Sequence, residues 1–459
     1  MVMAYSSSYS LLRYSSCLRN LQNKTCKYHL LSNNNIIRKR TTAAASSCYS
    51  SLSSFPNPSG LSSSDEKPIV SQFPLLVFPS GSPYDPKREL NRNASFRFFN
   101  PATNQFTAGQ VTSPLQKITE SAAYPVFSNR GWLTYLDFTD CSPFLVNALS
   151  PSPSQEDIIT LPSFKTFKPF TTEQIEEIRE CPDTVPHEAG KIALSSSPTE
   201  DNCVVMLWLG DLRLDPGSLK FARSEFAFCR IGDTRWTFLD REEIQDSKDR
   251  FEIGDIIYSN KDRLFYAELN GKLVAFDLNN TSSPVSFKCP IKYPGEYHSE
   301  FEKDVYANAP WSTSYLVESP QGDLLMIERF YPCLDKDGRI MEHKYADYIK
   351  FPYRSVYFNV YKLDVEKQTA EHFNLEDMAV FVGKNQSFCV SVGDYPGLSP
   401  NSIYFTDDHS QVMHPNFGCS HGGHDNGVYN VLTQSVSPLF QPFGFKKIRP
   451  APMWVSMPQ

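Results

Sequence analysis

Short apolar and aromatic runs, separated by turn-forming residues, follow one another along the chain after Pro68. Such runs, about four to eight residues long and bounded by Gly, Pro, Asn and Asp, are typical of β-strands, because aromatic and branched side chains suit a pleated, half-buried surface. We therefore predict strands at 73–78, 96–99, 131–137, 144–146, 204–208, 226–229, 236–238, 264–269, 272–278, 323–330, 358–363, 379–381, 388–392, 403–406 and 428–432.

The clearest local signal is an Asn-Gly pair, Asn270-Gly271, between two alternating apolar runs. Both central residues of a two-residue hairpin turn need positive φ, which Asn and Gly tolerate best, so the pair predicts a β-hairpin. The pair Asp337-Gly338 predicts a second hairpin turn. Helical signals are few, and the best of them is 171–180, with Thr172 as an N-cap. Because strands and helices do not alternate, a parallel α/β fold is disfavoured.

The strand groups recur at intervals of roughly 40–60 residues, a period that suits the four-stranded blades of a β-propeller. We predict an all-β fold, a single β-propeller of six or seven blades at 65–459, preceded by a disordered N-terminal leader. The segment 293–350 fits this period poorly. The alternative fold is a tandem of β-sandwiches.

Composition supports a large β-rich core, with 40% hydrophobic residues, 34 Pro, 33 Phe, 23 Tyr and 5 Trp. No apolar run approaches the roughly 18 residues of a spanning helix, so we expect no membrane insertion. The eight cysteines after the leader form no C-x-x-C pair and suggest isolated thiols rather than a disulfide framework. We expect the glycosylation sequons at Asn93, Asn280 and Asn385 to be unused.

Charge is unevenly distributed, because residues 1–64 contain no Asp or Glu and are rich in Ser. Their basic residues are Arg13, Arg19, Lys24, Lys27, Arg38, Lys39 and Arg40. The formal net charge is −7 for the whole chain and therefore −14 from Asp65 onward. This composition predicts an organellar transit peptide at 1–64, directed to the mitochondrion, with the chloroplast or dual targeting as alternatives. A disordered basic tail that binds nucleic acid is a further alternative.

One cluster of metal-ligand types stands out: Cys419, His421 and His424, with His414 nearby. Thiolate and imidazole suit zinc, but two glycines interrupt the stretch and no second cysteine pair completes it, so a structural loop is favoured. The stretch 335–338 superficially resembles a calcium loop, yet the later ligands of an EF-hand do not follow, and a turn is again favoured.

The sequence contains no complete catalytic motif that would indicate an enzyme. The turn at 232–236 is similar to the Asp-box of sialidase propellers, where such turns are structural, and no glycosidase carboxylate pair can be assigned. His187-Glu188 lacks the second His of a metalloprotease, and no nucleophile elbow, phosphate loop or dinucleotide fingerprint is present. We assign no catalytic, cofactor-binding or metal-binding residue and predict no cofactor. The acidic body also argues against nucleic-acid binding.

Three blocks in the last third of the chain carry a family resemblance: 378–388, 396–408 and 426–430. In their order and in the identity of their residues they resemble the plant KIB-type β-propeller family, the domain of unknown function often attached to F-box proteins. Locally, Gly383-Lys384-Asn385 predicts a turn between strands that end at Val382 and begin near Phe388. The segment 403–405 reads as a core strand that Asp407-Asp408 closes, and Gly427 as a position that a Cβ would crowd.

F-box members of that family place a helical F-box before the propeller, whereas this chain has the basic leader, so the resemblance is to an organellar branch without the F-box. The resemblance implies a role in plant stress or hormone response. We expect a non-enzymatic propeller that binds an unidentified protein partner across a broad loop face. The alternatives are a ubiquitin-ligase substrate receptor and a propeller hydrolase or oxidoreductase with its site in the central channel.

Overall fold

A computed structural model describes residues 74–79, 96–107, 127–137, 142–147, 158–166, 191–209, 225–239, 253–269, 272–279, 285–294, 305, 308, 312–409, 419–439, 448 and 451–456. All of them belong to one compact unit, Ile69–Gln459. The predicted leader at 1–64, the predicted helix at 171–180, His187 and His414 lie outside the described residues.

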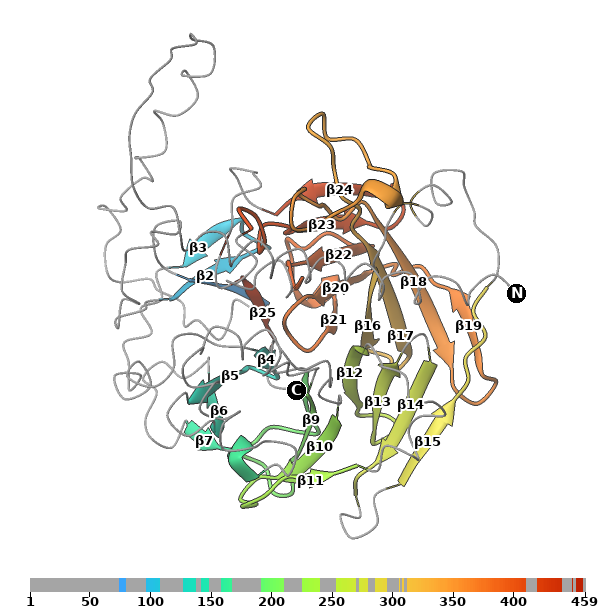
Figure 1. Ribbon diagram of the computed structural model, residues 1–459. Helices are drawn as coiled ribbons and strands as arrows, with labels where there is room; N and C mark the ends of the chain where they lie inside the picture. The colour runs from blue at the N-terminus through green and yellow to red at the C-terminus, as the bar shows by residue number, and fades with distance from the viewer. Residues whose placement is uncertain are drawn as a thin grey trace, which may run out of the picture. The chain divides into compact units, whose positions relative to one another are not determined.

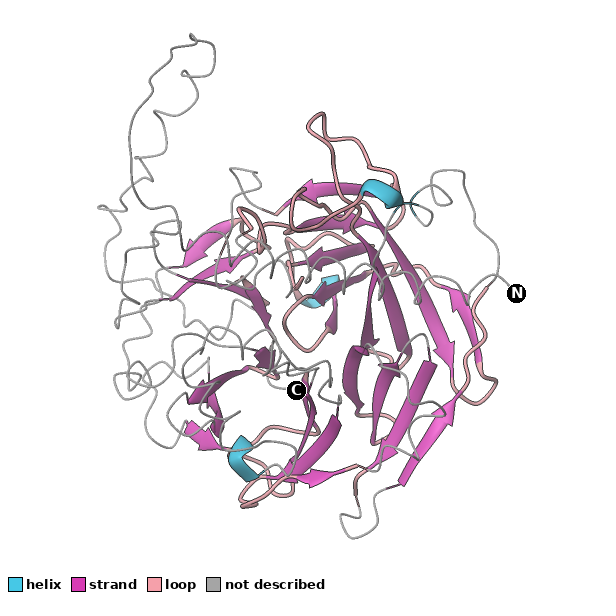
Figure 2. Cartoon of the chain, in the orientation of Figure 1, coloured by secondary structure: helices cyan, strands magenta, loops and turns pink. Residues whose placement is uncertain are grey.

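Six β-sheets make up the unit, and strands account for most of its regular structure (Figure 2). Blade 1 contains β25 (Met453–Val455), β1 (Leu75–Pro79), β2 (Phe96–Asn100) and β3 (Gln105–Thr107). Blade 2 contains β4 (Phe127–Asn129), β5 (Trp132–Asp137), β6 (Ser142–Asn147) and β7 (Ile158–Thr160). Blade 3 contains β8 (Ile192–Leu194), β9 (Val204–Leu209), β10 (Glu225–Arg230) and β11 (Thr237–Phe238).

The other three blades follow in chain order. Blade 4 contains β12 (Ile253–Ser259), β13 (Leu264–Leu269), β14 (Lys272–Asp277) and β15 (Val285–Cys289). Blade 5 contains β16 (Ser312–Glu318), β17 (Leu324–Phe330), β18 (Tyr357–Asp364) and β19 (Thr369–His372). Blade 6 has five strands, β21 (Phe388–Ser391), β20 (Met378–Val382), β22 (Ser402–Phe405), β23 (Gly427–Asn430) and β24 (Ser435–Pro438).

The sheets close into a six-bladed β-propeller (Figure 1). The C-terminal strand β25 pairs with β1, with Trp454 opposite Leu76, so one blade joins the two ends of the folded unit. Six buried hydrophobic clusters each combine side chains of two successive blades, and the last of them joins Phe381 of blade 6 to Phe99 of blade 1. The predicted propeller is confirmed, with six blades.

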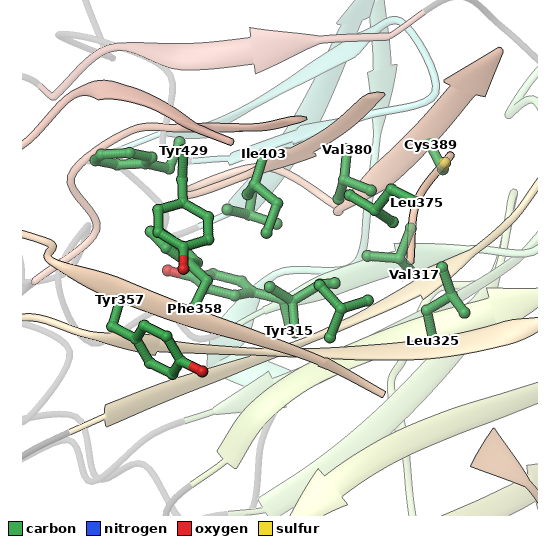
Figure 3. Packing of buried hydrophobic residues seen from close by; sticks show 14 of the residues in the cluster. Tyr315, Val317, Leu325, Tyr357, Phe358, Leu375, Val380, Cys389, Ile403 and Tyr429 are labelled. Atoms are coloured by element: carbon green, nitrogen blue, oxygen red, sulfur yellow. The ribbon is translucent and has the colours of Figure 1, made fainter. Parts of the chain in front are cut away.

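The core lies between the blades, because the central strands are buried on both faces. In β17, Leu324 and Met326 pack toward blade 4, while Leu325 and Ile327 pack toward blade 6. Figure 3 shows the interface between blades 5 and 6, where Val317 and Leu325 of one blade face Val380 and Cys389 of the other. Burial of apolar surface at about 25 cal/mol per Å² makes these interfaces the main favourable contribution to the fold.

The sequence-based turns are confirmed where the structure describes them. The strands β13 and β14 pair antiparallel with Leu269 opposite Lys272, as the predicted hairpin requires, and Asn270-Gly271 themselves lie outside the described residues. The second predicted turn, at Asp337-Gly338, closes with Asp335 N donating to Arg339 O at 2.9 Å. Residues 232–236 also form a turn, in which Arg230 N donates to Asp233 Oδ2 at 2.8 Å. In these two described turns the carboxylates of Asp335 and Asp233 accept hydrogen bonds from backbone N–H groups and so shape the backbone.

Blade 6 departs from the simple up-and-down order. Strand β20 runs outside β21, and the chain then crosses over so that β22 pairs parallel with β20. The turn predicted at 383–385 does connect these first two strands, which end at Val382 and begin at Phe388. A Cβ on Gly427 would lie 2.7 Å from Cζ of Phe405 and 2.9 Å from the carbonyl oxygen of Ser437, as the sequence predicted.

Replacing Gly427 by Ala is therefore expected to destabilise the protein by about 1–3 kcal/mol, because the added methyl group overpacks a region bounded by backbone and a buried ring. Equilibrium unfolding in urea measures the change. The matched control is Gly393→Ala, where the nearest atom to a new Cβ is Oγ of Ser391 at 3.6 Å, an ordinary contact. Equal unfolding midpoints for the two variants would contradict the crowding at Gly427.

Candidate functional site

A long excursion between β17 and β18 explains why the sequence period fails in this part of the chain. The chain leaves blade 5 at Tyr331 and returns at Val356. Isolated bridges pair Cys333 with Tyr353 and Leu334 with Ile340, and the excursion has its own buried cluster. This cluster includes Cys419, so the excursion packs against the connection between β22 and β23 of blade 6.

Arg329, in β17, is the central polar residue at this junction and is only 1% exposed. Its Nη2 donates to Asp425 Oδ2 at 2.9 Å, and its Nη1 donates to the carbonyl oxygen of Thr406 at 2.7 Å. Its Nε donates to Ser355 Oγ at 2.6 Å. One guanidinium thus joins blade 5, the excursion and the loops of blade 6.

The buried charge on Arg329 is compensated. Its Nη1 lies 3.4 Å from Asp408 Oδ1, and its guanidinium stacks 4.9 Å from the ring centroid of Phe405. Burial disfavours the charged form, but Tyr315 and the carboxylates of Asp425 and Asp408 raise its pKa well above the ordinary value. The guanidinium therefore stays charged, and every hydrogen-bonding nitrogen of its fork has a partner.

Asp407 organises the neighbouring loop. Its carboxylate accepts hydrogen bonds from Tyr353 Oη at 2.7 Å and from the backbone N of His424 at 3.0 Å. It also accepts from the backbone N of His409 and of Asp425, at 3.0 and 3.2 Å. Burial raises the pKa of Asp407. The side chain that the sequence predicted to close a core strand thus ties the loop of blade 6 to the excursion.

His409 is enclosed by aromatic rings. Its ring centroid lies 5.4 Å from Tyr331, 4.9 Å from Tyr348 and 5.0 Å from Tyr353. Burial, together with the positive charge of Arg329, lowers the pKa of His409 to about 3. The imidazole is therefore neutral at physiological pH.

The zinc candidates take part in this same junction. His421 Nε2 lies 2.7 Å from the carbonyl oxygen of Tyr348, and His424 Nε2 lies 3.0 Å from that of Tyr353. The Nδ1 of His424 accepts from the backbone N of Gly422 at 3.0 Å. Both imidazoles therefore form hydrogen bonds with backbone atoms. Among the described residues, no group of three or more His, Cys, Asp and Glu side chains is arranged to bind a metal ion.

A second polar cluster lies where the inner strands meet. Lys191 Nζ is 3.2 Å from Asp255 Oδ1, and Asp255 Oδ2 accepts from Ser387 Oγ at 2.9 Å and from the backbone N of Leu316 at 3.2 Å. Burial raises the pKa of Asp255, while Lys191 opposes that rise. These groups come from blades 3, 4 and 5 and from the turn before β21, so Asp255 connects four parts of the ring.

The turn before β21 also reaches blade 2, where Gln386 N donates to the carbonyl oxygen of Ser128 at 2.8 Å. Asn385 is 1% exposed, and its Nδ2 donates to the carbonyl oxygen of Gln386 at 2.8 Å. A glycan on this amide nitrogen is incompatible with the folded protein. Of the three sequons, Asn93 and Asn280 lie outside the described residues.

The tip of the excursion carries the feature most suited to contact with another molecule. Tyr345, in the 3₁₀ helix His343–Tyr345, is 62% exposed. Lys344 Nζ lies 4.8 Å from its ring centroid and 2.7 Å from Glu342 Oε2. An exposed aromatic ring with charged groups around it is the composition of an interface anchor with a polar rim.

Comparison with known proteins assigns the family. The KIB1-4 β-propeller model matches residues 98–430, from β2 in blade 1 to the end of β23 in blade 6. The chain belongs to the KIB1-4 β-propeller family. The motif blocks identified in the sequence fall within the match, and Arg329, Asp407 and Asp425 lie inside it as well. No curated protein matches this KIB1-4 chain.

Solved structures share only a remote likeness with the chain. The extracellular domain of a one-component system from B. thetaiotaomicron is 10% identical with a TM-score of 0.26, and the match covers 61% of this chain and 32% of that one. Porphyromonas gingivalis dipeptidyl peptidase 4 is 9% identical with a TM-score of 0.27, covering 75% and 48%. The dihydro-heme d1 dehydrogenase NirN, in complex with DHE, is 8% identical with a TM-score of 0.28, covering 86% and 75%. This chain thus spans about a third of the first of these proteins.

Proposed function

We propose that this KIB1-4 propeller is a non-enzymatic protein-interaction module and that its partner binds the tip of the excursion around Tyr345. The observation that carries the proposal is the exposed aromatic ring at the end of a braced segment, because large aromatic side chains are the usual anchors of protein interfaces. The acidic and basic side chains beside the ring supply the polar rim.

The base of the excursion is held in place, which favours binding. Arg329 and Asp425 both contact Ser355, close to the point where the excursion returns to blade 5. Asp407 holds the excursion through Tyr353. A segment fixed before binding loses less conformational entropy when a partner arrives, so a small contact surface can suffice.

The location and biological setting form a second part of the proposal. The acid-free, basic leader supports delivery to an organelle, with the mitochondrion first and the chloroplast as alternative. The buried Asn385 agrees with a route that bypasses glycosylation. Among the described residues, no helix has both the length and the apolar character needed to cross a bilayer. Family membership supports a role in plant stress or hormone response. A fluorescent fusion that remains in the cytosol would overturn the organellar assignment.

Replacing Tyr345 by Ala is expected to reduce capture of the partner by about tenfold or more, since loss of an interface aromatic costs about 2 kcal/mol. The measurement is affinity purification from isolated organelles with quantitative mass spectrometry, followed by a binding titration with the recovered protein. Stability should not change, because the ring is exposed.

The matched control is Leu432→Ala, which removes another exposed apolar side chain, 64% accessible, from the turn between β23 and β24. Its capture of the partner should equal that of the wild type. If Tyr345→Ala and Leu432→Ala recover the same proteins in the same amounts, the excursion is not the contact surface. Recovery of a Skp-type adaptor through the same tip would instead support a ubiquitin-ligase role.

A further inference from the structure

The turn 383–387 of blade 6, between β20 and β21, forms hydrogen bonds with blades that are not its neighbours. In the closed ring of six, blade 6 borders only blade 5 and blade 1. Yet Gln386 N donates to the carbonyl oxygen of Ser128 in blade 2 at 2.8 Å, and Ser387 Oγ donates to Asp255 Oδ2 in blade 4 at 2.9 Å. Each bond passes over one blade, so each crosses the interior of the ring, where Figure 1 shows the chain beside β21.

Blades 2 and 4 are also joined to each other inside the ring. Arg130 Nη2, in the turn between β4 and β5, donates to Asn260 Oδ1, in the turn between β12 and β13, at 2.9 Å. The alternate blades 2, 4 and 6 are therefore linked in pairs. Blades 2 and 4 flank blade 3, which lies directly opposite blade 6. Because the consecutive residues Gln386 and Ser387 reach these two blades, the turn lies at the axis of the propeller.

Blade 3 contributes to the same contact from the far side of the ring. The carbonyl oxygen of Lys191 accepts from Trp208 N within blade 3, and Lys191 Nζ lies 3.2 Å from Asp255 Oδ1. The Asp255 carboxylate thus contacts an ammonium group of blade 3 and a hydroxyl group of the opposite blade 6. Asp255, Ser128 and Ser387 are 0%, 1% and 2% exposed, so solvent has little access to this point.

We propose that the turn 385–387 is a built-in plug that fills the axis of the propeller and closes its central channel to ligands. The polar groups that could bind a ligand there are used by the protein itself, because Asp255 accepts from Ser387 and the carbonyl oxygen of Ser128 accepts from Gln386. A ligand in this part of the channel would have to displace the turn and break both bonds. The plug shares no residue with the proposed partner surface around Tyr345, so either proposal can fail without the other.

Thiol modification of the full chain tests whether the turn is sealed from solvent. A thiol introduced by Ser387→Cys should react with N-ethylmaleimide at least about a hundredfold more slowly than one introduced by Thr433→Cys, since it becomes accessible only when the turn opens. Thr433 is the matched control, because it lies in an exposed turn of the same blade, between β23 and β24. The wild-type protein gives the background from the native cysteines. Equal rates for the two variants would overturn the proposal.

A double-mutant cycle across the ring tests whether blades 3 and 6 meet at the shared carboxylate. Lys191→Met removes the counter-charge of Asp255 and favours its neutral form, and hydrogen bonds to charged groups are about twice as strong as neutral ones. The decrease in the urea unfolding midpoint caused by Ser387→Ala should therefore be about half as large in the Lys191→Met background as in the wild type.

The control for this cycle combines Ser387→Ala with Lys362→Met, which breaks an ion pair with Asp323 and shares no partner with Ser387. In that background Ser387→Ala should lower the midpoint by its full amount, because substitutions without a common partner have additive effects. If Ser387→Ala has the same effect in the Lys191→Met background as in the wild type, the two opposite blades are not connected at the axis, and the plug is overturned.

Discussion

Replacing Arg329 by Met is expected to lower the free energy of unfolding by about 3–5 kcal/mol, the usual cost of removing one member of a buried ion pair. The loss arises from the partners that remain. Asp425 would be buried at 2% exposure without its counter-charge, and the carbonyl oxygen of Thr406 would lose a donor at 2.7 Å. Urea unfolding followed by tryptophan fluorescence and circular dichroism measures the effect.

A double variant separates the ion pair from simple packing. Combining Arg329→Met with Asp425→Asn removes both charges, so it should recover part of the stability that Arg329→Met alone loses. The control is Lys362→Met, which breaks a half-buried, solvent-accessible pair with Asp323 in the same blade, at 2.8 Å, and should change stability by about 1 kcal/mol or less. If Arg329→Met costs no more than Lys362→Met, the buried network does not brace the excursion.

The sequence predicts the middle strands of the blades much better than the inner and outer ones, and burial explains why. Strand β13 is buried on both faces and so appears as an apolar run. Strand β12 carries the buried Asp255 among its apolar residues, which interrupts the pattern, and it was not predicted. Strand β19 is largely exposed and has few apolar residues, so it was also missed. Only the neighbouring blades reveal that such segments are strands.

The polar junction was only partly visible in the sequence. Arg329 lies inside the predicted strand 323–330, next to Glu328 and the apolar residues 324–327, and a charged residue within such a strand is a signal for a buried, paired group. Its partner Asp425 is 96 positions away, and no single-sequence pattern links the two. Asp407 was noted as the end of a strand, but its contact with Tyr353 depends on the excursion, whose fold has no periodic signature. The pairing of blades, rather than local sequence, creates the junction.

His409 is expected to make the free energy of unfolding depend on pH. With the pKa of His409 lowered to about 3 in the folded protein and about 6.5 in the unfolded chain, the unfolded state binds the extra proton between these values. The contribution of this residue to stability is therefore complete above about pH 6.5 and is lost as the pH falls, by about 1.4 kcal/mol per pH unit. Between pH 7 and pH 5 the loss should reach about 2 kcal/mol.

Replacing His409 by Phe tests this expectation, because Phe keeps an aromatic ring among Tyr331, Tyr348 and Tyr353 but cannot titrate. The backbone N of residue 409 can still donate to Asp407 Oδ1. The raised pKa of Asp407 and of Asp255 acts in the opposite direction, since such groups bind protons more readily in the folded state, but it acts in both proteins. The quantity to measure is thus the difference in unfolding free energy between wild type and His409→Phe from pH 5 to pH 7. A difference that does not change with pH would contradict the prediction, because it would mean that the pKa of His409 is the same in the folded and unfolded states. The imidazole would then become a cation among the three tyrosine rings as the pH falls to 5.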